Sequence, residues 1–234
     1  MEHGFFITGT DTNVGKTWAT ITLMRYFQAQ GKTVVGMKPV ASGCELIDGK
    51  LRNQDALLIQ QHGSIELDYD LINPFAYVDP VSPHLAGEKS PVALHKILET
   101  FEVLKQKAQI VLVEGVGGWL VPLNNEGDDV QALAKALNLP VILVVAIRLG
   151  CINHARLTYQ AITHAGLCCA GWLAMCVDRQ MLKQDDNIAT LGHFIKAPLL
   201  GIVPYSESAN FDLFAKNIDF TESIKHNCDK VFND

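Results

Sequence analysis

A glycine-bearing segment near the N-terminus carries residue types that bind phosphate. Residues 9–17 read Gly-Thr-Asp-Thr-Asn-Val-Gly-Lys-Thr and lie between the apolar run Phe5–Ile7 and a helical pattern. In such a strand–loop–helix unit, loop amides and the helix N-terminus present partial positive charge to an anion. Lys16 would reach the β- and γ-phosphates of a nucleotide, and the Thr17 hydroxyl would hold Mg²⁺. The segment therefore indicates a nucleotide site.

The loop departs from the usual phosphate-loop pattern, whose first glycine would fall at position 10. Thr10 stands there, and the glycine comes one residue earlier. An ordinary glycine-containing turn is the alternative interpretation. The strand before the loop and the helix after it favour the phosphate loop, because both lie where the mechanism needs them. The rest of the candidate nucleotide loop is Asn13, Val14 and Gly15.

Three charged residues follow other apolar runs or loops and extend the candidate site. Lys38 ends the second apolar run and could stabilise charge on a transferring phosphoryl group, or be a solvated surface charge. Because a lysine at a strand end supports no core, its removal should leave the fold intact. Asp55 could cap a helix or face the metal ion. Glu114 ends an apolar run before a glycine-rich turn, which predicts either a carboxylate on Mg²⁺ or a structural strand end.

Apolar runs alternate with helical patterns along most of the chain. Strands that are apolar on both faces and alternate with helices indicate an α/β fold: a mostly parallel central sheet with helices on both faces. Ligands then bind beyond the C-terminal ends of the strands. The strands are expected at 5–8, 33–37, 110–113, 141–146, 167–174 and 199–203, and the helices at 16–30, 92–107, 130–137, 153–165 and 185–195. Long loops and short helices are expected between 38 and 90, and an irregular segment after residue 205.

Composition bounds the class of protein. The 234 residues are 48% hydrophobic and 19% charged, which suits one large domain, expected at 1–225 with a tail at 226–234. A net charge of −6 argues against a general nucleic-acid or anionic-membrane binder. No run approaches the roughly 20 apolar residues that span a bilayer. The N-terminus lacks the basic start of a signal peptide, so a cytoplasmic protein is expected.

Six segments together make the chain resemble the dethiobiotin synthetase family of phosphate-loop NTPases. The resemblance covers about residues 4–205, and the order and spacing of the segments fit throughout. These segments are residues 8–17 (TGTDTNVGKT), 38–43 (KPVASG), 51–56 (LRNQDA), 113–119 (VEGVGGW), 149–155 (LGCINHA) and 197–201 (APLLG).

The resemblance implies an ATP-dependent, magnesium-requiring ligase of biotin synthesis that acts on a small molecule. CO₂ and 7,8-diaminononanoate would form a carbamate, ATP would phosphorylate it, and the second amine would close the ring of dethiobiotin. By similarity, Lys16, Lys38 and Thr12 are catalytic, and Thr17, Asp55 and Glu114 surround Mg²⁺. The remaining nucleotide contacts would be Asn13, Val14, Gly15, Gly115, Val116, Gly117, Met175, Cys176, Val203, Pro204 and Tyr205.

Family members are homodimers that hold the substrate carboxylate across the interface. By similarity, Ser42 contacts substrate in its own subunit, and a helix start binds the carboxylate of the partner's substrate through its amides. Asn153 could alternatively be an ordinary N-cap. The residues of this helix start are Gly150, Cys151, Ile152 and Asn153.

Three positions depart from the family pattern. Asn13 replaces an acidic residue, Asn187 aligns with a tyrosine near the substrate tail, and Met175-Cys176 replaces an Asn-Asp pair that recognises the base. Three other functions are possible for a phosphate-loop protein: a partitioning-type regulatory ATPase, a GTPase switch and an inactive nucleotide-binding scaffold. The first needs an additional lysine where Asp11 stands, and the second needs an Asn-Lys-x-Asp motif, which the sequence lacks.

Overall fold

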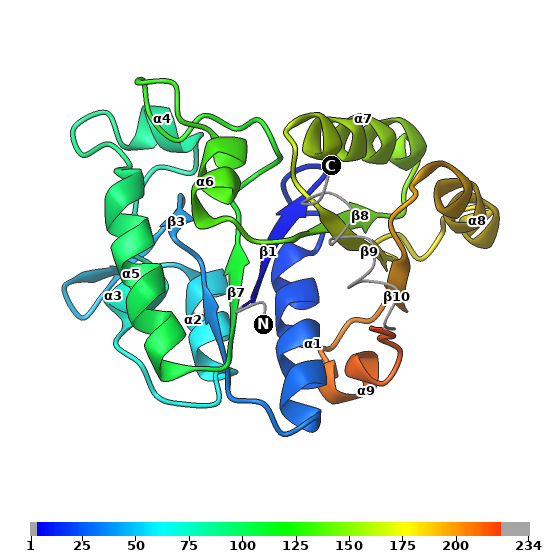
Figure 1. Ribbon diagram of the computed structural model, residues 1–234, viewed down its shortest axis with the longest axis horizontal. Helices are drawn as coiled ribbons and strands as arrows, with labels where there is room; N and C mark the ends of the chain where they lie inside the picture. Colours follow the sequence, from blue (N-terminus) through cyan, green and yellow to red (C-terminus); the bar gives the residue numbers. More distant parts are fainter. Residues whose placement is uncertain (1–3, 221–234) are drawn as a thin grey trace.

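A six-stranded parallel sheet forms the centre of the molecule in the computed structural model, which describes residues 4–220 (Figure 1). The strand order is β10-β9-β8-β1-β7-β2, and every neighbouring pair is parallel. The strands are β1 (Gly4–Gly9), β2 (Val34–Met37), β7 (Ile110–Glu114), β8 (Val141–Ala146), β9 (Cys169–Met175) and β10 (Leu199–Val203). The expected strands and the α/β fold are confirmed, with ends shifted by one or two residues.

Helices cover both faces of this sheet. The longer helices are α1 (Lys16–Ala29), α2 (Gln54–Gln61), α5 (Leu94–Lys107), α6 (Val130–Leu137), α7 (Cys151–His164) and α8 (Gln184–Phe194). Helix α1 covers one face of the sheet together with α2, and right-handed connections place α5, α6, α7 and α8 on the other face. Helix α1 contacts α2, α5 contacts α6, and α7 contacts α8.

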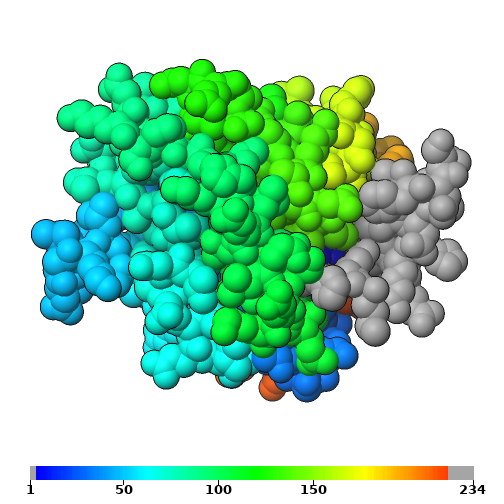
Figure 2. All heavy atoms as spheres, turned by 60° about the vertical axis from the view of Figure 1, so that its left-hand side comes forward, coloured from blue at the N-terminus to red at the C-terminus, as the bar shows by residue number. Residues whose placement is uncertain are grey.

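The segment between β2 and α5 contains the expected loops and short helices, and also four short strands that were not expected. A two-stranded parallel sheet joins β3 (Val40–Ala41) to β6 (Phe75–Ala76), and β4 (Glu45–Ile47) pairs antiparallel with β5 (Lys50–Arg52). The β4–β5 hairpin protrudes from the body of the molecule (Figure 2). Two one-turn helices, α3 (Tyr69–Ile72) and α4 (Pro83–Ala86), complete the segment.

The segment after residue 205 is not wholly irregular, because it contains a further helix, α9 (Phe211–Ala215). Phe211 and Phe214 pack their rings on Trp18 of α1 at centroid distances of 5.7 and 5.9 Å. This helix was missed because five residues give too short a pattern to recognise without the partner surface. The expected tail, 226–234, and the expected boundary at 225 lie outside the described residues.

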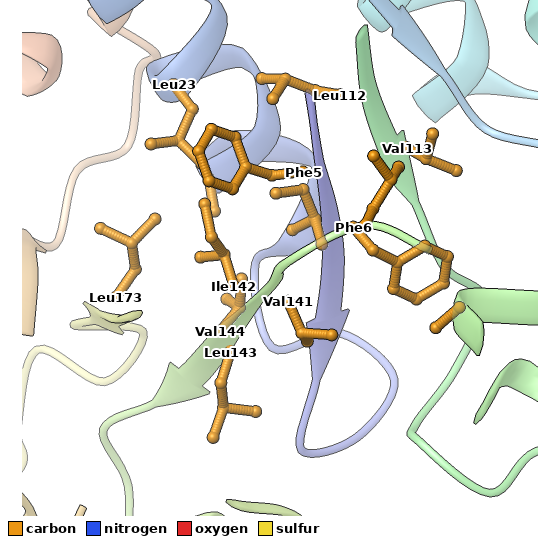
Figure 3. Close-up of a cluster of buried hydrophobic side chains, with 14 of the residues drawn as sticks. Phe5, Phe6, Leu23, Leu112, Val113, Val141, Ile142, Leu143, Val144 and Leu173 are labelled. Carbon is orange, nitrogen blue, oxygen red and sulfur yellow. The ribbon is translucent and has the colours of Figure 1, made fainter. Parts of the chain in front are cut away.

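The core lies between the sheet and the helices on its two faces. Figure 3 shows side chains from β1, β7 and β8 meeting Leu23 of α1. Phe5 and Phe6 alternate on β1 and are both buried, which explains why a strand with two covered faces is apolar throughout. This packing holds the C-terminal ends of β1, β2 and β7 side by side, at the edge of the sheet where the candidate residues lie.

Candidate active site

A cleft of about 820 Å³ opens at the C-terminal ends of β1, β2 and β7. Most of the residues predicted for phosphate, metal and substrate contacts line it. The predicted residues in its lining are Thr12, Asn13, Gly15, Lys16, Thr17, Lys38, Ser42, Asp55, Glu114, Val116 and Gly117. Trp18, Asn53, Val121 and the segment 80–83 complete the lining and were not predicted.

The phosphate loop adopts the backbone that its sequence requires. Gly15 is the N-cap of α1 with φ +93°, and Asn13 has φ +58°, so both lie in the left-handed region. Asparagine tolerates that region better than most residues, and glycine enters it without steric cost. Val14, between them, is fully buried and anchors the loop to the core. The loop therefore presents its amides and the α1 N-terminus to the cleft.

Lys16 bridges the phosphate loop and the turn after β7. Its Nζ donates hydrogen bonds to the carbonyl oxygens of Asp11 and Gly117, at 2.8 and 2.7 Å. Burial, and then the positive charge of Lys38, lower the pKa of Lys16 to about 8, although nearby carboxylates oppose the shift. A lysine held in this way retains a cation beside the loop amides and can exchange carbonyl partners for phosphate oxygens.

Glu114 is the most enclosed charged group of the site, with no exposed surface. Its Oε1 accepts hydrogen bonds from Thr17 Oγ1 at 3.0 Å and Lys38 Nζ at 2.5 Å, and its Oε2 accepts one from Thr20 Oγ1 at 2.9 Å. These three donors compensate for the loss of water around the carboxylate. Thr20 was not predicted, although its spacing of three from Thr17 places both hydroxyls on one helix face.

Lys38 is buried, so it is not the solvated surface charge that the sequence left open, and its burial argues against the expectation that its removal leaves the fold intact. Only 5% of the residue is exposed, and its ammonium also lies 3.3 Å from Asp55 Oδ2. Burial alone would lower the pKa of Lys38, but the attraction of Glu114 and Asp55 outweighs it and raises the pKa. Lys38 is therefore a permanent cation at neutral pH, placed between two carboxylates.

Two alternatives left open for helix starts are settled by the structure. Asn53, rather than Asp55, caps α2, since its side chain accepts the Ala56 N–H at 3.2 Å. Asp55 is half-exposed and lines the cleft. Gly150, rather than Asn153, is the N-cap of α7, and Asn153 lies exposed in its first turn.

The oxygen donors fit a magnesium ion. Thr17, Glu114 and Asp55 present one hydroxyl and two carboxylates to the same cleft, and Mg²⁺ prefers such hard oxygen ligands with water and phosphate completing its shell. Thr17 Oγ1 and Glu114 Oε1 are already 3.0 Å apart. The Lys38 ammonium shows that these two carboxylates attract a cation in this place.

Ser42 has an unused hydroxyl in the cleft. Its Oγ is one of four side-chain polar atoms in residues 4–220 that are buried without a hydrogen-bond partner. Buried polar atoms are ordinarily paired, so an orphaned hydroxyl at a cleft wall indicates a ligand contact. This supports the prediction that Ser42 contacts substrate.

The predicted base contacts lie apart from the cleft lining. Met175 is buried at the end of β9, and a Cβ placed on Gly15 would lie 3.1 Å from its Cε, so its side chain packs beneath the phosphate loop. The Cys176 N–H donates to the Val203 carbonyl at 2.9 Å. These are two of the backbone groups that were predicted to contact the base, and here they are hydrogen-bonded to each other. Pro204 and Tyr205 follow β10.

The predicted tail-binding residues also lie outside the cleft lining, at the start of α7. They are nevertheless tied to the phosphate loop, because Arg148 donates from Nη2 to Asp11 Oδ2 at 3.0 Å. Asp11 Oδ1 in turn accepts the N–H of Thr12 at 2.7 Å. Neither Asp11 nor Arg148 was predicted as a site residue, because this contact joins segments 137 positions apart.

Comparison with known proteins gives consistent relatives. A family model described as an AAA domain matches residues 3–211. An ATP-dependent dethiobiotin synthetase from Xanthomonas axonopodis pv. citri is 46% identical over 90% of this chain and 95% of its own length. One from Nitrosospira multiformis is 47% identical over 89% of this chain and 91% of its own.

Solved structures show the same fold at low sequence identity. The MinD cell division protein of Aquifex aeolicus is 15% identical, covers 99% of this chain and 98% of its own, and superposes with a TM-score of 0.55. MinD from Pyrococcus horikoshii, solved with Mg-ADP, is also 15% identical, covers 87% and 82%, and has a TM-score of 0.52. These likenesses concern the fold alone.

Proposed function

The chain belongs to the family of ATP-dependent dethiobiotin synthetases, and we propose that it makes dethiobiotin from 7,8-diaminononanoate, CO₂ and ATP, with release of ADP and phosphate. One observation in the structure carries the proposal. Two buried lysines from different elements, Lys16 at the start of α1 and Lys38 just after β2, converge on a single cleft beside a phosphate loop. A nucleotide-binding scaffold would need the first of these lysines, but it has no use for the second.

The chemistry develops negative charge rather than requiring a strong base. CO₂ adds to one amine of the substrate to form a carbamate, and a carbamate oxygen then attacks the γ-phosphorus of ATP while the bond to ADP breaks. The second amine attacks the carbamoyl carbon of this mixed anhydride, phosphate leaves, and the cyclic urea forms. Lys16 and Lys38 stabilise the charge on phosphoryl and carbamate oxygens. Thr12 and Ser42 orient the carbamate end.

We assign the metal to the same cleft. Thr17, Glu114 and Asp55 would hold Mg²⁺, which when bound neutralises the triphosphate and the leaving group. The loop amides of Asn13, Val14 and Gly15 bind the phosphates. Gly115, Val116 and Gly117, together with Met175, Cys176, Val203, Pro204 and Tyr205, are assigned to the remainder of the nucleotide.

We further assign the start of α7 to a homodimer interface, where Gly150, Cys151, Ile152 and Asn153 bind the carboxylate of the partner's substrate. Exposed apolar side chains support this, since Leu149 is 94% and Leu182 is 84% exposed near the starts of α7 and α8. Cys151 Sγ lies 3.9 Å from Asn187 Oδ1. Asn187, which aligns with the family's tyrosine near the substrate tail, therefore lies beside the same helix start. The described part of the chain has no helix long and apolar enough to cross a membrane, and we assign the enzyme to the cytoplasm.

Phosphate release tests the proposal directly. The purified protein is incubated with Mg-ATP, and diaminononanoate and bicarbonate are omitted one at a time. We expect turnover only when both are present, with dethiobiotin detected by mass in equal amount to phosphate. Turnover without the diamine would instead indicate a regulatory ATPase, and nucleotide binding without turnover would indicate an inactive scaffold.

A further inference from the structure

The backbone of Lys38 lies beyond the end of its strand, and α3 supplies its hydrogen-bond partners. β2 ends at Met37, so no sheet neighbour continues the ladder past that residue. The Lys38 N–H donates instead to the Ile72 carbonyl at 2.8 Å, and Asn73 Nδ2 donates to the Lys38 carbonyl at 2.7 Å. Residues at the end of α3 therefore hold both backbone polar groups of Lys38.

A tyrosine hydroxyl connects this arrangement to the helix that carries Asp55. Tyr69 Oη donates to Asn73 Oδ1 at 3.0 Å and accepts the N–H of Asn53 at 2.8 Å. Asn53 is the N-cap of α2, and Asp55 is the second residue of that helix. Burial raises the pKa of Tyr69, so its hydroxyl keeps its proton and remains a donor at neutral pH.

We propose that Tyr69 and Asn73 are positioning residues that set the Lys38 ammonium relative to the Asp55 carboxylate. The four residues Asn53, Tyr69, Asn73 and Lys38 are all buried, and their hydrogen bonds form one continuous chain between the two sides of the cleft. Neither Tyr69 nor Asn73 lines the cleft, so both act through other residues. The inference deepens the proposed function and rests on it for the roles of Lys38 and Asp55.

The chain of hydrogen bonds matters because the lysine is flexible and its partners are close. Lys38 Nζ lies 3.3 Å from Asp55 Oδ2, on a side chain with four rotatable carbons. A misplacement of about 1 Å at a reacting group can cost on the order of 10²-fold in rate. Burial of these polar groups also means that water cannot replace a missing partner at low cost.

Tyr77 provides a matched control for the same substitution. It is buried to the same extent as Tyr69, and its Oη donates to the Ser90 carbonyl at 2.8 Å. Tyr77→Phe therefore removes one buried hydroxyl and one hydrogen bond without touching Lys38, Asn53 or Asn73. Tyr69→Phe removes two hydrogen bonds rather than one, so the stability of both variants is measured, and an effect that arises only from the loss of a buried hydroxyl should appear in Tyr77→Phe as well.

The experiment compares Tyr69→Phe, Tyr77→Phe and the wild-type protein at a temperature where thermal unfolding shows all three to be folded. Steady-state phosphate release gives kcat and KM, and calorimetry gives the affinity for Mg-ATP without turnover. We expect Tyr69→Phe to lose about tenfold in kcat and about threefold in Mg-ATP affinity, while Tyr77→Phe keeps both. Asn73→Ser, which removes the donor to the Lys38 carbonyl, should reproduce the Tyr69→Phe result.

Two results would overturn the positioning role: wild-type kinetics and affinity in Tyr69→Phe, or equal losses in both phenylalanine variants. The proposed function fails separately, if the wild-type protein shows no diamine-dependent phosphate release. In that case the calorimetric comparison still decides the inference, because an unchanged Mg-ATP affinity in Tyr69→Phe contradicts it.

Discussion

Lys38 and Glu114 lie side by side because their strands are neighbours in register. Met37, the last residue of β2, pairs with Val113 of β7, so the residues that follow them, Lys38 and Glu114, lie at the same level, and Lys38 Nζ reaches Glu114 Oε1 at 2.5 Å. The pair is buried, and each member compensates for the desolvation of the other. The positive charge of Lys38 that the reaction needs therefore also helps to stabilise this end of the sheet.

Lys38→Met should remove both activity and stability. Loss of one preorganised positive group costs about 2.7–4 kcal/mol in the transition state, or roughly 10²–10³ in rate. Leaving Glu114 without its ion partner should lower the free energy of unfolding by about 3–5 kcal/mol. Denaturant unfolding and phosphate release measure the two effects. The double variant Lys38→Met/Glu114→Gln should recover stability but not turnover; wild-type turnover in folded Lys38→Met would show the assigned role to be wrong.

Activity should decline above about pH 8 through Lys16. Its pKa is lowered to about 8 in the folded protein by burial, so the free enzyme loses the phosphate-binding cation as the pH rises past that value. We expect kcat/KM for ATP to fall on this alkaline limb. In Lys16→Arg this decline should disappear, because a guanidinium stays charged. An identical alkaline limb in Lys16→Arg would assign it to another group.

The same pKa shift affects stability. Between pH 8 and 10.5 the unfolded chain binds more protons at Lys16 than the folded one, so the contribution of Lys16 to the free energy of unfolding rises with pH in that range.

Glu114→Gln should weaken the response to Mg²⁺. The substitution keeps the shape of the side chain but removes the charge that a hard cation prefers. The measurement is phosphate release against Mg²⁺ concentration, and the half-saturation point should rise. Asp55→Asn, which alters the half-exposed carboxylate of the same cleft, should shift it in the same direction. A half-saturation point that does not move in Glu114→Gln would make Glu114 purely structural.

Two inactive variants should complement each other if the active unit is a dimer. In a mixed dimer of Lys38→Ala and Asn153→Ala, one site combines an intact Lys38 with an intact α7 start from the other chain. The other site carries both defects, so partial activity should return. The measurement is phosphate release after mixing, with subunit exchange verified by differently tagged chains. Exchange without any recovery would argue against a shared site.

Nucleotide selectivity should be loose at the base. Met175 cannot donate and accept hydrogen bonds as an asparagine does, and its side chain is buried against Gly15. Loss of an edge-reading contact removes discrimination of about 1–3 kcal/mol, so CTP or GTP should be used within about tenfold of ATP. Values of kcat/KM for the three nucleotides measure this. Met175→Asn should raise the preference for ATP, and a thousandfold preference in the wild-type protein would show that other groups read the base.

The sequence by itself determined the local features of this protein. Gly15 and Asn13 allow the left-handed backbone of the phosphate loop. Apolar runs predict strands that are covered on both faces and pair in parallel. Lys16 and Thr17 follow the loop directly, so they stand at the start of α1 whatever the rest of the fold. These depend on backbone sterics and side-chain periodicity over a few residues. They suffice to identify the phosphate loop and the order of the main strands and helices.

Only the tertiary structure decided which distant groups share the cleft. The pairing of Lys38 with Glu114 requires β7 to lie between β1 and β2, and the hold of Asn73 on the Lys38 carbonyl requires α3 to fold back to the end of β2. The burial of Met175 beneath Gly15 likewise depends on where β9 ends. Such contacts join residues far apart in the chain, and because no local pattern encodes them, they form only when the sheet assembles and its core excludes water.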